Sequence, residues 1–126
     1  MKTERARGCE ENYMKSESTA ILLRIFIGES DHYKGKPLYM YIVEMLKAEG
    51  IAGATVFRGI AGFGKHSRIH TTSILRLSTD MPILIEVSDL EENIERIRPK
   101  LDEVIKQGLI TEEKVKIVFY DSDKNK

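Results

Sequence analysis

The sequence predicts a single α+β domain whose elements follow the order β-α-β-β-α-β. Four segments alternate apolar and polar residues with a period of two, which is typical of strands. Two longer segments carry apolar residues at helical spacing, and Gly or Pro punctuates the connections. Two helices on one face of a four-stranded antiparallel sheet form the ferredoxin-like arrangement, which is the fold we expect.

The first strand and the first helix follow an N-terminal tail. Residues 1–18 are polar and aperiodic, so we expect a disordered tail there. Residues 19–28 alternate and form the first strand. Pro37 suits the first position of a helix, and Gly50 is expected to end that helix.

The central part of the chain is expected to hold two strands joined by a long connection. Residues 53–61 form the second strand, and residues 62–73 form a mobile loop or a hairpin tip. Residues 74–78 are expected to continue as strand. A break at Met81 and Pro82 then precedes the third strand, over residues 83–87.

The second helix and the last strand complete the domain. Ser88 and Glu91 have the spacing of a capping box at the helix start, and Pro99 predicts a kink or a break within the helix. Residues 114–120 alternate and form the last strand. The domain is therefore expected to span residues 19–120, with a flexible tail over 121–126.

The composition restricts the class of protein. The chain has 126 residues, and its 20 Lys and Arg balance its 20 Asp and Glu. A neutral chain argues against general nucleic-acid binding, because phosphate contacts need excess positive charge. Cys9 has no partner for an intrachain disulfide, and no apolar run approaches a membrane span or a signal peptide. We expect a cytoplasmic protein that is not membrane-embedded, and the few Asn and Gln residues favour a heat-adapted source.

The sheet face opposite the helices is expected to be apolar. No helix is left to cover that face, and a bare apolar face of this size is a liability in a monomer. We therefore expect another copy of the chain to cover it. Arg24 and Glu86 lie on the same face in neighbouring strands and are expected to pair. The apolar residues placed on this face are Leu22, Phe26, Phe57, Leu84 and Val118.

A charge asymmetry marks the one candidate binding segment. Residues 50–79 contain no Asp or Glu, and a basic segment in a neutral chain indicates an anion site. Glycines at 59, 62 and 64 allow backbone N–H groups to approach a phosphate closely. A flexible hairpin tip with solvated basic residues explains the pattern equally well, so both interpretations stand. The basic residues and histidines of the segment are Arg58, Lys65, His66, Arg68, His70 and Arg76.

The sequence offers little for catalysis or metal binding. The glycine pattern matches no named phosphate-binding motif. His66 and His70 are four residues apart, but the surrounding glycines disfavour a helix and no third ligand is nearby. Glu29 and Asp31 are most simply turn residues. We therefore assign no catalytic residue and no metal ligand.

Several stretches of the chain together resemble one known family, the domain of unknown function 190, over about residues 19–120. The stretches are Gly28-Glu29-x-Asp31, Gly35-x-Pro37-Leu38-Tyr39, the run from Gly53 to Gly64, Ser67-Arg68-Ile69-His70-Thr71 and Leu77-Ser78-x-Asp80-x-Pro82. That family is similar in turn to the PII signalling proteins. The resemblance implies a trimer of ferredoxin-like subunits with clefts between neighbours.

The resemblance also implies a function. Many PII-like proteins bind adenine nucleotides in those clefts and contact a partner, often a transporter or an enzyme, through a long loop. PII proteins have a second phosphate loop, rich in Gly and Lys, before the last strand. The equivalent stretch here, residues 106–111, contains one glycine.

We therefore expect a non-enzymatic, trimeric, PII-like regulator that binds an anionic metabolite, with an adenine nucleotide as the suspected ligand and loop 62–73 for the partner. Gly62 and Gly64 would allow close backbone approach, Lys65 and Arg68 would neutralise phosphate, and Phe63 would stack on a base or pack under the loop. Arg58 and His70 complete the expected site. The alternatives are a small-substrate enzyme that uses His66 or His70 in the same cleft, and a metal-responsive or structural trimer.

Overall fold

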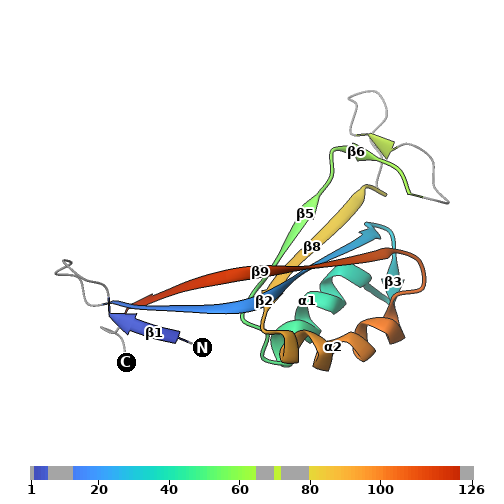
Figure 1. Ribbon diagram of the computed structural model, residues 1–126. Helices are drawn as coiled ribbons and strands as arrows, with labels where there is room; N and C mark the ends of the chain where they lie inside the picture. The colour runs from blue at the N-terminus through green and yellow to red at the C-terminus, as the bar shows by residue number, and fades with distance from the viewer. Residues whose placement is uncertain (1, 6–12, 65–69, 72–79, 123–126) are drawn as a thin grey trace.

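The computed structural model describes residues 2–5, 13–64, 70–71 and 80–122. It confirms the α+β class and the ferredoxin-like order of the main elements (Figure 1). The main strands are β2 (Tyr13–Gly28), β5 (Ala54–Arg58), β8 (Pro82–Asp89) and β9 (Leu109–Ser122). The helices are α1 (Leu38–Ala48) and α2 (Glu91–Val104). Short strands are β1 (Lys2–Arg5), β3 (His32–Tyr33), β4 (Lys36–Pro37), β6 (Ala61–Gly62) and β7 (His70–Thr71).

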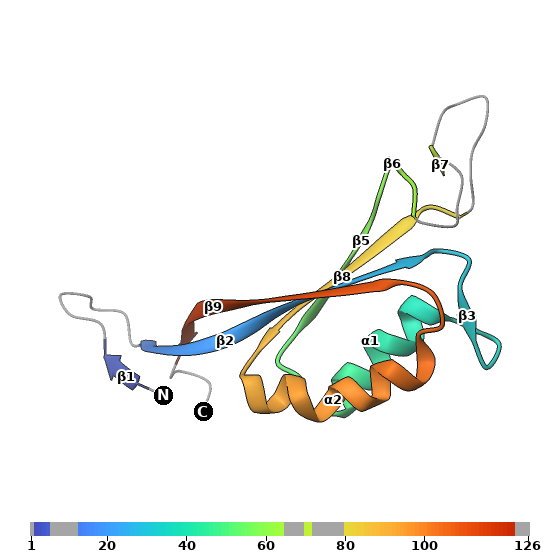
Figure 2. The same ribbon diagram turned by 45° about the vertical axis from the view of Figure 1, so that its right-hand side comes forward.

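The main sheet is antiparallel throughout. β2 lies in its centre, between β9 and β8, and β5 pairs with the far side of β8. Both helices lie on one face of this sheet, as Figure 2 shows. Neither helix is long and apolar enough to cross a membrane, in the part of the chain that the structure describes.

The core lies between the helices and the sheet. Alternate residues of β2 and β8 point toward the helices and are buried, because side chains of a strand alternate between its two faces. Ile25, Ile85, Ile42 and Leu101 show how the two layers meet, since each is fully buried. The helix periodicity in the sequence therefore predicted the core-facing stripes correctly.

The predicted boundaries of α1 agree with the structure better than the predicted start of α2 does. Pro37, expected at the first position of α1, is the N-cap residue one position earlier. Gly50 follows the helix with a φ of 82°, as the sequence predicted. The capping box at Ser88 and Glu91 is wrong, because Ser88 lies inside β8. Leu90 is the N-cap residue and has no side-chain capping hydrogen bond. Buried Asp89, which precedes it, holds the start of α2 instead. Its Oδ1 accepts hydrogen bonds from Leu90 N at 2.7 Å and Asn93 Nδ2 at 2.8 Å.

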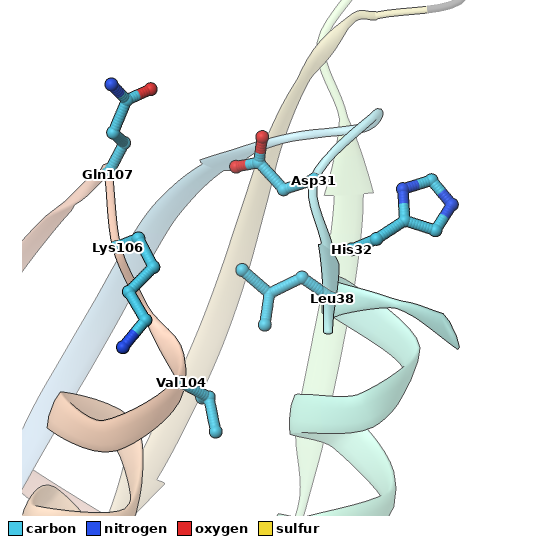
Figure 3. A pocket seen from close by; sticks show the side chains of 6 residues that line it. All are labelled: Asp31, His32, Leu38, Val104, Lys106 and Gln107. Carbon is cyan, nitrogen blue, oxygen red and sulfur yellow. The ribbon is translucent and has the colours of Figure 1, made fainter. Parts of the chain in front are cut away.

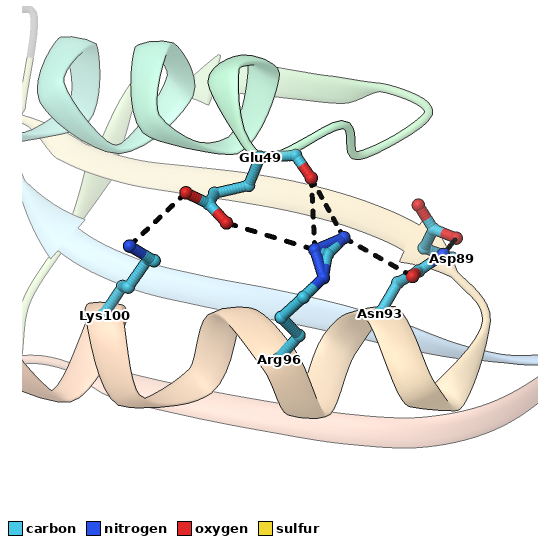
Figure 4. A network of polar contacts seen from close by, with 5 residues as sticks. All are labelled: Glu49, Asp89, Asn93, Arg96 and Lys100. Atoms are coloured by element: carbon cyan, nitrogen blue, oxygen red, sulfur yellow. Dashed lines mark hydrogen bonds and ion pairs between the residues drawn. The ribbon is translucent and has the colours of Figure 1, made fainter.

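A polar network ties the start of α2 to the end of α1 (Figure 4). Asp89 Oδ2 accepts a hydrogen bond from Ala52 N at 3.0 Å. Arg96 donates two hydrogen bonds to the backbone carbonyl of Glu49, and Lys100 Nζ lies 3.3 Å from Glu49 Oε2. These cations satisfy and stabilise the carbonyl end of α1.

The expected break at Pro99 does not occur, and α2 continues through it to Val104. Proline leaves the carbonyl of the residue four positions earlier without its helical donor. Here that residue is Glu95, and both Glu95 and Pro99 lie on the exposed side of α2. Water can therefore satisfy the carbonyl, and the helix persists.

Two strands are longer than the sequence predicted. β2 begins at Tyr13 rather than residue 19, and β9 runs from Leu109 to Ser122 rather than from 114 to 120. Residues 2–5 and 13–18, expected to be a disordered tail, are strand, and β1 pairs with β2. Backbone pairing needs no apolar side chain, which explains why the polar sequence gave no signal. The expected strand at 74–78 lies outside the described residues.

The paired ends of β2 and β9 form what we call the ribbon extension, residues 13–19 with residues 116–122. It projects beyond both helices in Figures 1 and 2. Ser18 lies opposite Ile117 and Ser16 opposite Phe119, whereas Glu17 lies opposite Val118. The ribbon extension therefore has two sides of different composition.

One predicted residue lies on the wrong face. Val118 was placed on the open sheet face, but its partner in register is Glu17, on the side of the helices. Ion pairs confirm the alternation along β9: Glu112 pairs with Arg98 of α2, and Glu113 pairs with Arg24 on the open face. The odd-numbered residues of β9 share the open face because the strand begins at Leu109, opposite Phe26.

Candidate functional site

The candidate site lies at the end of the sheet where β5 ends and β8 begins. The chain leaves β5 at Gly59, whose N–H donates to the carbonyl of Pro82 at 2.7 Å. On the other side, Glu29 N donates to the carbonyl of Met81 at 2.9 Å. The base of the acid-free segment is therefore held between the loop after β2 and the start of β8.

Glu29 holds Arg58 at this base. Arg58 Nε lies 3.0 Å from both carboxylate oxygens of Glu29, and Glu29 Oε1 also accepts a hydrogen bond from Met81 N at 3.3 Å. The Glu29 side chain is 26% exposed and that of Arg58 is 46% exposed. A carboxylate at this distance offsets much of the attraction that Arg58 offers an anion. The sequence hid this pair, because its members are 29 positions apart.

Two further carboxylates fix the loop after β2. Asp80 Oδ1 accepts a hydrogen bond from Ser30 N, and Asp31 Oδ2 accepts one from Gly28 N, each at 3.0 Å. A side chain at position 28 would place its Cβ 3.0 Å from Asp80 Oδ1. The role of Asp31 as a turn residue, expected from the sequence, agrees with this geometry.

Gly62 has a packing role that the sequence did not indicate. A Cβ at this position would lie 2.9 Å from Cγ of Pro82. Cβ atoms in proteins essentially never come this close to another heavy atom. Gly62 pairs in register with His70, which joins β6 to β7. Phe63 follows and is 72% exposed, while Ile60 is 77% exposed.

The expected site residues are only partly brought together. Arg58, Gly62 and Phe63 lie at the base of the segment, and His70 follows the backbone of β7 beside Gly62. Gly64 ends the described stretch before the gap. Lys65, His66 and Arg68, as well as most of loop 62–73, lie outside the described residues.

A small pocket lies near this end, between the loop after β2 and the end of α2. Its volume is about 250 Å³, and Leu38 points into it whereas the His32 ring points away (Figure 3). The remaining lining residues are Asp31, Val104, Lys106 and Gln107. Ligand pockets usually measure about 300–1,000 Å³, so this pocket is small for a nucleotide.

The chemistry of the pocket is mixed. Lys106 Nζ donates to the carbonyl of Glu103 at 3.1 Å, at the end of α2. His32 Nδ1 lies 2.6 Å from the carbonyl of Ser30, so this nitrogen carries a proton. Lys106 belongs to the stretch compared above with the second phosphate loop of PII proteins. Within the described ranges, no three His, Cys, Asp or Glu side chains are placed to hold a metal ion.

The open face of the sheet carries apolar residues and one charged cluster. Arg24 Nε lies 3.0 Å from Glu86 Oε2, which confirms the predicted pair, and Arg24 also reaches Glu113 Oε1 at 2.8 Å. Hydrogen bonds to Glu86 and then to Glu113 raise the pKa of the Arg24 guanidinium. Phe26 and Phe57 remain 38% and 46% exposed in the single chain.

Comparisons with known proteins agree with the fold. Residues 20–117 match DUF190, a family described as uncharacterized ACR. A UPF0166 protein of Methanocaldococcus jannaschii is 48% identical over 92 residues, which is 72% of this chain and 84% of the relative. A UPF0166 protein of Aquifex aeolicus is 42% identical over 100 residues, covering 78% of this chain and 92% of the relative.

The fold of this chain is also similar to that of a solved structure. The solved structure is that of CPII, a nitrogen regulatory PII-like protein from Thiomonas intermedia K12, bound to ADP, AMP and bicarbonate. The TM-score is 0.56 at 16% sequence identity, and the match covers 81% of this chain and 91% of CPII. The likeness shows a common fold.

Proposed function

The chain belongs to the DUF190 family and has a PII-like fold, and from this premise we propose that it is a homotrimeric regulator that binds an adenine nucleotide. The observation that carries the proposal is the exposed, glycine-rich turn at the base of an acid-free, basic segment. CPII, which shares the fold, is described as bound to ADP and AMP. The protein is proposed to act by binding and not by catalysis.

The nucleotide site lies in a cleft between subunits. The pocket described above, about 250 Å³, is smaller than usual for a nucleotide, which supports a site that a second subunit completes. Lys65 and Arg68 supply positive charge to the phosphates, and Gly64 allows close backbone approach. Phe63, 72% exposed in the single chain, supplies a ring on which the base can stack.

Arg58 and Gly62 have structural roles in the proposed site. Arg58 remains paired with Glu29 and holds the base of the segment, and Gly62 allows the segment to turn against Pro82. His70 lies on the returning strand beside Gly62. Loop 62–73 then contacts a protein partner, and nucleotide binding at its base alters that contact.

The open sheet face supports the proposed trimer. Phe26 and Phe57 are too exposed there for a monomer of this size, and Leu84 lies between them in register. A face-to-face contact among three copies removes these side chains from water. The charged cluster around Arg24 forms its ion pairs within one chain, where one guanidinium contacts two carboxylates.

Titration calorimetry with ATP, ADP, AMP and cyclic AMP tests the nucleotide site. Arg68→Ala is expected to weaken binding by about 1.5–3 kcal/mol, the contribution of a charge-assisted hydrogen bond. Gly64→Val is expected to abolish binding and leave the fold intact. Lys65→Ala is expected to weaken binding. Its control is Lys47→Ala, at an exposed position of α1, which is expected to bind as the wild type does. Absence of binding at millimolar concentration of every nucleotide would contradict the proposal.

A further inference from the structure

Among the residues that the structure describes, no helix lies on either side of the ribbon extension, residues 13–19 with 116–122. A strand pair without a second layer is marginal in water, because it buries little apolar surface. β1 adds a third strand at residues 14–17 but adds no second layer. The family match covers residues 20–117, so most of the ribbon extension lies outside it.

The two sides of the ribbon extension differ in chemistry. On the side of the open sheet face, Ile117 and Phe119 lie opposite the small residues Ser18 and Ser16, and Phe119 is 53% exposed. On the other side, Lys116 Nζ lies 3.5 Å from Glu17 Oε2. Val118 and Tyr120, 37% and 59% exposed, share that charged side. The residues directly opposite Ile117 and Phe119 are therefore small.

The apolar side is continuous with the open sheet face. The odd-numbered residues of β9 lie on the side that Phe26 occupies in β2, and the apolar ones among them are Leu109, Val115, Ile117 and Phe119. Thr111 and Glu113 lie between Leu109 and Val115, and Glu113 is paired with Arg24. Leu109 is 59% exposed, so exposed apolar residues occur at both ends of this row. A copy that covers the open face also meets the row of the ribbon extension, because no change of face separates them.

We propose that the ribbon extension packs through Ile117 and Phe119 on a second copy of this chain and extends the contact between subunits beyond the helix-backed sheet. The inference rests on the oligomer proposed above. A second copy fits this surface because it presents an apolar sheet face of its own, with Phe57 46% exposed at its far edge. The charged side, with Glu17 and Lys116, faces water.

The test compares two neighbouring substitutions that place the same charge on opposite sides. Phe119→Lys puts an ammonium group on the apolar side, and Val118→Lys puts one beside Glu17. Sedimentation equilibrium over a dilution series of the full chain measures the dissociation constant of the oligomer. We expect Phe119→Lys to raise it at least tenfold and Val118→Lys to leave it within about twofold of the wild-type value.

A cross-linking experiment identifies the occupant. Benzoylphenylalanine at position 119 of the purified protein is expected to give covalent products between copies, with attachment on the open sheet face. The same group at position 118 is expected to give few or none. Circular dichroism of both lysine variants verifies that the sheet is retained.

The outcomes separate this inference from the proposed function. A stable oligomer that both lysine variants leave unchanged overturns the inference and leaves the proposed trimer intact. Equal dissociation by both variants also overturns it, because the two sides would then not differ. A monomeric wild type at micromolar concentration overturns the trimer itself, and products of position 119 confined to a single chain overturn the docking on a second copy.

Discussion

Asp89 is predicted to stabilise the fold more than any neighbouring polar residue. It is 7% exposed, and its carboxylate accepts hydrogen bonds from Ala52 N, Leu90 N and Asn93 Nδ2 at 2.7–3.0 Å. Asp89→Asn keeps one acceptor oxygen and replaces the other with an NH2 group. At least one donor then loses its acceptor, which costs about 1–3 kcal/mol for a buried group.

Asp89→Ala removes both acceptor oxygens and with them all three hydrogen bonds. Two of the donors are backbone N–H groups, so the loss amounts to roughly 2–5 kcal/mol in the free energy of unfolding. The matched control is Ser88→Ala, one residue earlier, which the capping box in the sequence would have made important. In the structure Ser88 lies on the open face of β8. We expect its removal to cost less than about 0.5 kcal/mol.

Thermal unfolding at a fixed protein concentration measures these differences. A loss of 1 kcal/mol lowers the Tm by roughly 2–8 °C for domains near this size. The concentration must be fixed because association stabilises the folded chain. If Ser88→Ala lowers the Tm as much as Asp89→Asn does, the assignment of the stabilising contacts at the start of α2 to Asp89 is wrong.

Three further predictions follow from the same contacts. Burial raises the pKa of Asp89, but the hydrogen bonds from Asn93, Ala52 and Leu90 and the charge of Arg96 outweigh burial, so the pKa is lowered from its ordinary value. The stability that Asp89 adds is therefore present above about pH 4 and is lost as the pH falls through the lowered pKa. The difference in Tm between wild type and Asp89→Asn should shrink in that acidic range and not between about pH 5 and 7. Gly62→Ala should destabilise the protein, because its Cβ would meet the Pro82 ring at 2.9 Å, whereas Gly53→Ala, with open space around it, should not; equal melting curves for the two variants would contradict the close contact. Phe26→Asp should dissociate the oligomer by placing a charge on the open face, and light scattering that still reports the wild-type mass would show that this face is not the contact.

Short-range patterns predicted much of the fold. The alternation in residues 19–28 and 83–87 placed the core side chains correctly, and the topology then predicted the contact of Arg24 with Glu86. Local signals failed where long-range contacts decide the structure. Ser88 has the sequence spacing of a cap, but the pairing of β8 with β2 through Asp89 draws it into the strand.

The candidate site was less accessible to sequence reasoning. The pair between Glu29 and Arg58 joins the loop after β2 to the end of β5, and no periodicity connects their positions. The face of Val118 depends on where β9 begins, which the weakly patterned residues 109–113 did not reveal. The glycines at 59 and 62 gave a signal, but part of their role is contact with Pro82, which only the fold brings near.

Native mass spectrometry of the full chain with ADP or AMP tests the central claim most directly, because it counts protein copies and bound nucleotides in one spectrum. We predict a trimer that carries up to three nucleotides, one for each cleft. In Gly64→Val we predict the same trimer without nucleotide. A monomer, or a trimer that takes up no nucleotide at millimolar concentration, would contradict the account.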